Sequence, residues 1–253
     1  MKLQDKVAIV TGGGKGIGRA TCLAFAREGA AVVVNFSKSE AEAQAVVQEI
    51  TAGGGRAIAV RADVSRDAEA RALIDAAVQH FGRLDILVNN AGYTRPTPHR
   101  ELDLLTEELI DRTLGVNVKG PIYCTRAAVP HMLKNGGGSI INITSVAGIM
   151  ATGSSVIYCG SKAALAVITK ALARAFAPQI RVNALAPGFV DTGFVVPPMG
   201  EARANAAKRN HLGRTVEEED LAAAALFLVT DGNALTGQEI VLDGGVVALG
   251  PRQ

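Results

Sequence analysis

Tryptophan is absent from this chain of 253 residues, and aromatic side chains make up only 4% of it. Cysteine is scarce as well: Cys22, Cys124 and Cys159 are far apart, odd in number and in no metal-ligand spacing. This usage argues against a disulfide framework and against a cysteine-based metal site, and it favours a reduced, intracellular protein. We expect the thiols to pack in the core and no metal to be bound.

An excess of charge of either sign is also lacking, because 26 Lys and Arg residues face 24 Asp and Glu residues and leave a net charge of +2. Such a balance gives no support to nucleic acid or a membrane as a partner. Residues Met1 to Lys6 lead straight into an apolar run without the pattern of a signal peptide, and no apolar run is long enough to cross a bilayer. We therefore expect a cytoplasmic protein.

Apolar residues make up 48% of the chain, enough for one large core. They gather in short runs that alternate with longer helical stretches such as Glu40 to Thr51, Arg66 to Phe81 and Val156 to Ala177. Runs that are apolar throughout are typical of parallel strands covered by helices on both faces. We predict one α/β domain over residues 1–253, a doubly wound parallel sheet of seven strands at Val7–Val10, Ala31–Asn35, Ala57–Arg61, Ile86–Asn89, Ser139–Thr144, Ile180–Leu185 and Glu239–Leu242.

The stretch from Phe189 to Leu212 breaks this alternation. It carries Pro197-Pro198 and several apolar residues, and it is too long for a plain connection between a strand and a helix. Long connections of this kind often close over a bound substrate. We predict a substrate lid at residues 189–212.

A glycine-rich turn follows the first predicted strand and reads Thr11-Gly12-Gly13-Gly14-Lys15-Gly16-Ile17-Gly18. Glycines at such spacing allow a tight turn and bring the amides of the next helix close to a phosphate. A nucleotide-hydrolysing P-loop would need Ser or Thr after Gly-Lys, whereas Lys15 is followed by Gly16. The position after the first strand favours dinucleotide binding over a turn that is merely tight.

Tyr158 and Lys162 are four residues apart in a predicted helix, so they lie on one face of it. A nearby ammonium favours the phenolate form and could bring the phenol pKa closer to neutral, which suits proton exchange with a substrate oxygen. Taken alone, the pair could equally be a partly exposed aromatic ring beside a solvated charge.

Together these residues resemble the short-chain dehydrogenase/reductase family, in particular its 3-oxoacyl-carrier-protein reductases, carbonyl reductases and secondary alcohol dehydrogenases. The resemblance spans nearly the whole chain. The glycine turn matches Thr-Gly-x-x-x-Gly-x-Gly, and Tyr158 stands thirteen residues beyond Ser145. The other matching motifs are Asp63-Val64, Asn89-Asn90-Ala91-Gly92, Asn117, and Pro187-Gly188-Phe189-Val190-Asp191-Thr192.

This resemblance implies a Rossmann fold, a homotetramer and hydride transfer between a nicotinamide cofactor and a carbonyl or secondary alcohol carbon. Tyr158 would be the general acid/base, Lys162 would hold the cofactor ribose, Ser145 would bind the substrate oxygen, and Asn117 would hold a water that links Lys162 to solvent. The implied cofactor-binding residues are Gly12, Gly14, Lys15, Gly16, Ile17, Gly18, Asn35, Ser37, Asp63, Val64, Asn90, Ala91, Gly92, Tyr158, Lys162, Pro187, Gly188, Val190 and Thr192.

Charge indicates which nicotinamide cofactor is used. An acid at the end of the second strand would bind the ribose hydroxyls of NAD and repel the 2′-phosphate of NADP. The stretch from Val34 to Lys38 contains no acid, and Lys15, Ser37 and Asn35 could bind the phosphate. We expect NADP(H) rather than NAD(H), with relaxed specificity as the alternative.

The substrate is less defined by the sequence. Lys134 is the one charged residue at the helix ends where carrier-protein reductases bind their acidic partner, although Arg174 or Lys208 could substitute. This favours a free small ketone or ketoester over an acyl carrier protein. The remaining alternatives are a non-enzymatic NADP-binding sensor or scaffold and, fitting less well, an epimerase or dehydratase of nucleotide sugars. The expected pocket wall is apolar, or packs under the lid, and comprises Tyr93, Ala147, Met150, Phe189, Phe194, Val195 and Met199.

Overall fold

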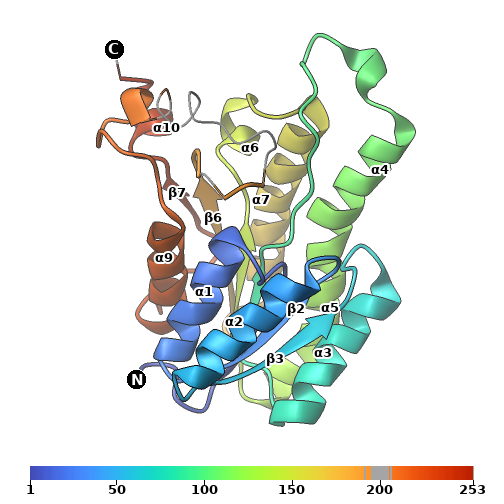
Figure 1. The fold of residues 1–253 in the computed structure, drawn as a ribbon, viewed down its shortest axis with the longest axis vertical. Coiled ribbons are helices and arrows are strands. Elements are labelled where there is room, and N and C mark those ends of the chain that lie inside the picture. The colour runs from blue at the N-terminus through green and yellow to red at the C-terminus, as the bar shows by residue number, and fades with distance from the viewer. Residues whose placement is uncertain (191, 195–204, 206, 253) are drawn as a thin grey trace.

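A computed structural model describes residues 1–190, 192–194, 205 and 207–252 of the protein. Its centre is a seven-stranded sheet in the order β3-β2-β1-β4-β5-β6-β7, in which every neighbouring pair is parallel (Figure 1). This confirms the doubly wound α/β fold. The strands are β1 (Val7–Val10), β2 (Ala31–Phe36), β3 (Arg56–Arg61), β4 (Ile86–Asn89), β5 (Gly138–Ile143), β6 (Ile180–Pro187) and β7 (Glu239–Leu242).

The predicted strand bounds agree with the structure to within one or two residues. The largest difference is at β6, which continues past the predicted end at Leu185 to Pro187. Pro187 lies opposite Leu242 of β7 in the parallel register. The ladder therefore continues to its last residue, because a proline at the end of a strand keeps its carbonyl acceptor.

Helices cover both faces of the sheet. Buried side chains of α1, α2 and α9 pack on one face, and those of α3, α5 and α7 pack on the other (Figure 1). The helical elements are α1 (Gly16–Arg27), α2 (Glu40–Ala52), α3 (Asp67–Phe81), η1 (Leu102–Leu104), α4 (Glu107–Leu114), η2 (Gly115–Lys119), α5 (Gly120–Lys134), α6 (Ala147–Met150), α7 (Val156–Phe176), α9 (Glu218–Thr230) and α10 (Val246–Leu249).

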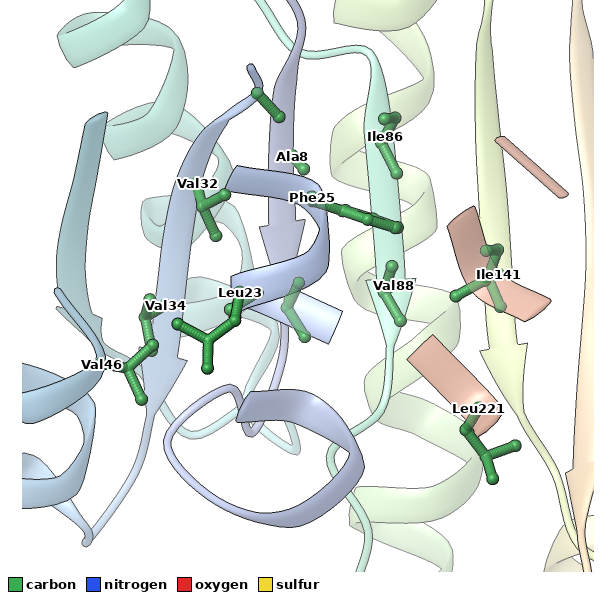
Figure 2. Packing of buried hydrophobic residues seen from close by; sticks show 14 of the residues in the cluster. Ala8, Leu23, Phe25, Val32, Val34, Val46, Ile86, Val88, Ile141 and Leu221 are labelled. Carbon is green, nitrogen blue, oxygen red and sulfur yellow. The ribbon is translucent and has the colours of Figure 1, made fainter. Parts of the chain in front are cut away.

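Apolar side chains on both faces fix the helices to the sheet. Figure 2 shows one of these layers, in which Leu23 and Phe25 of α1 and Leu221 of α9 face the sheet residues Val88 and Ile141. Phe25, Val88 and Ile141 are fully buried. Complete burial of a side chain of this size stabilises the fold by about 1.5–3 kcal/mol. The scaffold beneath the strand ends is therefore rigid.

Helix α7, with 21 residues, is by length and composition apolar enough to cross a membrane. Its sequence is not one uninterrupted apolar run, because Lys162, Lys170 and Arg174 lie within it. The helix packs against β6, α6 and α4, and its buried residues include Leu165 and Ala173. These buried residues therefore belong to the core of the α/β fold.

The strand order places the candidate site. The chain leaves β1 toward β2 on one side and reaches β4 on the other, and in such sheets a crevice opens at the carboxyl ends where the order reverses. The segments that follow β1, β3, β4, β5 and β6 all lie at this edge. Half of the predicted lid at residues 189–212 lies outside the described residues, including Val195 and Met199.

Candidate active site

The turn after β1 needs its glycines. Gly12 and Gly16 have φ angles of +62° and +56°, a region that other residues rarely adopt. A Cβ atom on Gly18 would lie 2.3 Å from the carbonyl oxygen of Gly12. Helix α1 begins at Gly16, so its first free amides lie at this turn. The turn and the helix start form a cradle that fits an anionic phosphate.

Thr11 and Asn90 hold this turn against the segment after β4. The Thr11 hydroxyl accepts hydrogen bonds from the amides of Asn90 and Ala91, both at 2.9 Å. The side-chain nitrogen of Asn90 donates to the carbonyl oxygens of Thr11 at 2.9 Å and Gly12 at 3.1 Å. The predicted residue Asn90 thus supports the cradle, and Thr11 is a supporting residue whose hydroxyl role the sequence reasoning missed.

Asn35 also supports the turn rather than facing a ligand. Its side-chain oxygen accepts from the Gly12 amide at 3.2 Å, and its nitrogen donates to the carbonyls of Val60 at 3.2 Å and Ala62 at 3.1 Å. Only 2% of Asn35 is exposed. The Asn35 amide hydrogens are therefore used inside the protein, and the expected hydrogen bond from Asn35 to a 2′-phosphate is not supported. The reason is that β2 lies between β1 and β3, so this side chain joins the segments after both strands.

Lys15 has a partner that the sequence reasoning did not assign. Its Nζ lies 2.5 Å from Oε1 of Glu42 in the first turn of α2, and both side chains are about half exposed. This ion pair lowers the pKa of the Glu42 carboxyl. Ser37 is half-buried one residue past the end of β2. The cation expected to attract a 2′-phosphate therefore already has an acidic neighbour.

Asp63 and Val64 follow β3 at the same edge. The Asp63 carboxylate accepts hydrogen bonds from Ser65 and from Nη1 of Arg112, the latter at 2.9 Å. Val64 is buried, and a Cβ on Gly120 would lie 2.9 Å from its side chain. Asp63 thus presents a side chain at the crevice, whereas the Val64 side chain packs beneath it.

The segment after β6 returns to the glycine turn. A Cβ on Gly16 would lie 3.0 Å from the Thr192 side chain, and one on Gly92 would lie 3.4 Å from the Phe194 ring. A Cβ on Gly188 would lie 2.9 Å from Asp243. Of the predicted residues here, Pro187 is buried and Val190 is half-buried. The structure thus brings this segment beside the turn.

Helix α7 fixes the backbone of Tyr158 at both polar groups. The buried N-cap residue Ser155 accepts from the Tyr158 amide at 3.2 Å. The Ser161 hydroxyl donates to the Tyr158 carbonyl at 2.7 Å. The cap that starts α7 therefore also fixes the position of Tyr158. A Ser three residues before Tyr158 is a capping signal that can be recognised in the sequence.

Lys162 lies beneath the Tyr158 ring. It is 4% exposed, and its Nζ donates to the carbonyl of Ile143 at 2.7 Å and lies 5.7 Å from the ring centroid. Burial lowers the pKa of Lys162 to about 8. The four-residue spacing does bring the two groups to one face of the helix.

The pKa of Tyr158 differs from the sequence-based expectation. Burial raises the pKa of Tyr158 to about 12, although a hydrogen bond with Ser145 acts in the opposite direction. The ammonium of Lys162 was expected to lower the Tyr158 pKa. Burial disfavours the phenolate and prevails, and Lys162 is itself desolvated and donates to the carbonyl of Ile143.

Asn117 lies in the π-helical turn η2 between α4 and α5. Its side-chain oxygen accepts from the Tyr93 amide at 2.8 Å, and its nitrogen donates to the Tyr93 carbonyl at 3.0 Å and to the Ser161 hydroxyl at 2.9 Å. The fully buried side chain therefore joins the segment after β4 to α7. Such turns are frequent at functional sites.

Of the predicted substrate residues, Ser145 and Phe194 lie near the Tyr158 ring. The Ser145 side chain acts to lower the pKa of Tyr158, and its hydroxyl accepts from the Ala147 amide at 3.1 Å. The Phe194 ring is 45% exposed and its centroid lies 6.4 Å from that of Tyr158. Met150 and Phe189 are half-buried. Ala147 is buried and its Cβ packs against Gly153, so its side chain is not on the open wall.

This arrangement suits proton transfer next to a bound anion. Two hydroxyl groups, of Ser145 and Tyr158, interact at the edge of the sheet, with the Lys162 amine near the phenol ring. Within the described ranges, no group of three or more His, Cys, Asp or Glu side chains is placed to hold a metal ion. Because the Ser145 and Tyr158 side chains both carry hydroxyl groups, a substrate oxygen at this point would meet hydrogen-bond donors.

Known proteins are similar to this chain in sequence and in architecture. Residues 6–199 match the model of the short chain dehydrogenase family. An uncharacterized oxidoreductase of Methylorubrum extorquens is 46% identical over 97% of this chain and 99% of its own length. A short chain dehydrogenase from Burkholderia cenocepacia, solved in complex with NADP, superposes with a TM-score of 0.90 and 39% identity over 98% of this chain and all of its own.

A third similar protein is a 3-ketoacyl-(acyl-carrier-protein) reductase from Brucella melitensis, solved with NADH. It has a TM-score of 0.87 and 36% identity, with 96% of this chain and 98% of that chain covered. The family match and these full-length similarities agree with the strand order and with the Ser145, Tyr158 and Lys162 cluster. The chain therefore belongs to the short-chain dehydrogenase/reductase family of oxidoreductases.

Proposed function

We propose that this oxidoreductase transfers a hydride between NADP(H) and the carbon of a free small ketone or ketoester, or of the corresponding secondary alcohol. The observation that carries the proposal is the cluster in which the Ser145 side chain acts on the Tyr158 hydroxyl and the buried Lys162 amine lies 5.7 Å from the phenol ring. Two hydroxyl groups that lie close together can both donate hydrogen bonds to a substrate oxygen, and they stabilise the negative charge that develops on it during the reaction.

In this proposal Tyr158 is the general acid/base. As the substrate carbonyl is reduced, the Tyr158 hydroxyl donates its proton to the carbonyl oxygen, and it accepts a proton when the alcohol is oxidised. The nicotinamide ring supplies or takes up the hydride when the cofactor is bound. A phenol that burial keeps protonated, with a pKa of about 12, is in the correct state to donate.

Ser145 and Lys162 support this proton transfer. The Ser145 hydroxyl orients the substrate oxygen and stabilises its developing charge. Lys162 binds a ribose hydroxyl and, since burial lowers its pKa to about 8, can exchange a proton near neutral pH. The side chain of Asn117 holds Ser161 and Tyr93 in place, and the water-mediated link from Lys162 to solvent remains a proposal for this residue.

The preference for NADP(H) rests on charge. No acid occurs between Val34 and Ser39, and Lys15 stands in the glycine turn. The cradle at Gly12, Gly16 and Gly18 fits a pyrophosphate. Among similar proteins one was solved with NADP and another with NADH, so kcat/KM must be measured for both cofactors. A higher kcat/KM with NADH would contradict this part of the proposal.

A panel of ketones and ketoesters, followed by the loss of NADPH absorbance, tests the reaction. Turnover of free ketones, absent in Tyr158→Phe, supports the proposal. Tight NADPH binding without turnover of any compound would favour a non-enzymatic sensor or scaffold instead. The panel should include linear, branched and aromatic ketones, because the half-buried Met150 and Phe189 and the exposed Phe194 favour apolar groups.

A second candidate is 3-oxoacyl-[acyl-carrier-protein] reduction, since relatives with this activity in their names are up to 41% identical over 97% of the chain. Lys134, Arg174 and Lys208 are the cations available for an acidic carrier. Comparison of one 3-oxoacyl group as a free thioester and on a carrier protein separates the candidates. A large gain in kcat/KM on the carrier, lost when these cations are neutralised, would favour the second.

We also propose one domain for the chain and a homotetramer as its assembly. Apolar residues are exposed on the outer helices, at Ile122 and Leu133 of α5 and at Val156 and Val167 of α7. The interfaces would use residues 115–134, 156–177 and 221–242. Size-exclusion chromatography with light scattering measures the assembly, and a monomer at micromolar concentration would contradict it. The cytoplasmic location stays a prediction.

A further inference from the structure

The Asp63 carboxylate is held at both oxygens. Oδ1 accepts from the amide of Ser65 at 3.1 Å and from its hydroxyl at 2.6 Å. Oδ2 accepts from Nη1 of Arg112 at 2.9 Å, in an ion pair whose side chains are 35% and 21% exposed. Burial opposes ionisation of Asp63, but these hydrogen bonds and the Arg112 charge prevail and hold its pKa below the usual value.

These contacts leave one acceptor position on the carboxylate. An ionised carboxyl group has about four lone-pair positions, two on each oxygen. Ser65 uses both on Oδ1, and Arg112 uses one on Oδ2. Considering the described residues alone, the remaining position is on the oxygen that Arg112 orients. A ligand donor would therefore bind the oxygen held by Arg112.

Arg112 is fixed by a second contact. Its guanidinium lies over the Tyr93 ring, 5.7 Å from the centroid. The backbone of Tyr93 is held in turn by the side chain of Asn117. An arginine with both a carboxylate and an aromatic partner has little rotational freedom left, so its position defines that of the carboxylate.

The strand order indicates which part of the cofactor Asp63 meets. The pyrophosphate cradle is at the end of β1, and the Tyr158 site lies beyond β4 and β5. A dinucleotide that spans the crevice must therefore extend its other half over the ends of β2 and β3. Asp63 lies two residues past the end of β3. On that half the ribose adjoins the pyrophosphate and its hydroxyls lie nearer the end of β2, whereas the base lies farther out, so the donor at the end of β3 is the exocyclic amino group of adenine.

We propose that Arg112 is a positioning residue for base recognition, which orients Asp63 to accept a hydrogen bond from the adenine amino group. This inference rests on the proposed use of a nicotinamide adenine dinucleotide. Arg112 is on α4, 49 residues from Asp63 in the chain. Helix α4 thereby contributes to cofactor selection without touching the base.

The test compares NADPH with its hypoxanthine analogue, in which a carbonyl oxygen replaces the amino group. Dissociation constants are measured by cofactor fluorescence for the wild type, Arg112→Met, Arg112→Lys and Asp63→Asn. We expect the wild type to bind NADPH about tenfold tighter than the analogue, as for loss of a hydrogen bond to a charged group. Arg112→Met should reduce this ratio to about threefold or less.

Arg71→Met is the matched control, because Arg71 also pairs with an aspartate, Asp67 at 3.2 Å, but does not contact Asp63. It should keep the wild-type ratio. Arg112→Lys keeps the charge but cannot keep the planar fork, so an intermediate ratio is expected. Thermal unfolding checks that each variant folds. If Arg112→Met does not fold, the ratios of Arg112→Lys and Asp63→Asn test the inference in its place.

Three results would overturn the inference. These are a wild type that does not distinguish the two bases, an Arg112→Met variant with the full ratio, and equal weakening of both cofactors, as expected for a merely structural role. Failure of the proposed reaction is a separate result: a wild type that turns over no ketone can still show the tenfold base preference in binding. That outcome would support the positioning role of Arg112 and would reject the proposed reduction of free ketones.

Discussion

Tyr158 is the residue whose replacement separates binding from chemistry. Tyr158→Phe removes only the phenol oxygen, and the backbone contacts from Ser155 and Ser161 do not need that atom. We expect the dissociation constant for NADPH to change less than threefold while kcat falls roughly 10²- to 10⁴-fold, as for loss of a general acid. Stopped-flow fluorescence and steady-state kinetics measure the two. Turnover within tenfold of the wild type would contradict the assignment.

Glu42 is expected to weaken the preference for NADP(H), because it neutralises Lys15 at 2.5 Å. Glu42→Gln should free this cation and raise kcat/KM for NADPH by about two- to fivefold, the range of an exposed ion pair. The value for NADH should change little, since NADH lacks the 2′-phosphate. High salt should reduce the gain, because exposed charges are screened.

Glu49→Gln is the control for this prediction. Glu49 is also on α2 and pairs with Arg19 at 2.6 Å, away from Lys15. It should leave the ratio of NADPH to NADH efficiency unchanged. If Glu42→Gln raises the efficiency with both cofactors equally, the Lys15 and Glu42 pair has no part in cofactor choice.

Helix α7 depends on a buried cap at its first turn. Ser155 is fully buried and accepts from the Tyr158 amide at 3.2 Å. Ser155→Ala should lower the free energy of unfolding by about 1–2 kcal/mol, because it removes a buried cap and leaves the Tyr158 amide without its side-chain acceptor. Thr106→Ala, at the N-cap of α4 where the bond is 3.3 Å, is the comparison and should cost less. Denaturant titration measures both, and equal effects would contradict the role of burial.

Local patterns in the sequence identified the helix of Tyr158 and Lys162, the glycine turn and all seven strands. These features depend on spacing within one element, which a sequence contains directly. The partners of Lys15, Asn35 and Asp63 were not predicted. Each partner comes from another element, as with Arg112, and which side chain meets which depends on how the elements pack. The raised pKa of Tyr158 was missed for the same reason, because burial is a property of the folded chain.

At the scale of the whole molecule, Asp85 joins the strands at the end of the sheet opposite the active site. Its carboxylate accepts from Arg83 at 2.6 and 2.8 Å and from the Val7 amide at 3.0 Å, with Lys6 at 3.4 Å. Its backbone also binds β1 and Ser139 of β5. Burial opposes ionisation, but the hydrogen bonds from Arg83 and Val7 and the nearby charges hold the pKa of Asp85 below its usual value.

This lowered pKa fixes the sign of a pH dependence. Between the folded and unfolded pKa values of Asp85 the unfolded chain binds more protons, so the stabilisation is present above about pH 4 and is lost as pH falls. Asp85→Asn should therefore lower the free energy of unfolding by about 1–3 kcal/mol at pH 7, and by progressively less below pH 4. Asp231→Asn, which affects the exposed pair with Lys2 and an exposed hydrogen bond from Thr230, should change stability little at either pH. Urea titrations at pH 7 and pH 3.5 test this, and a deficit in Asp85→Asn that stays constant with pH would mean that its shape rather than its charge holds the strands together.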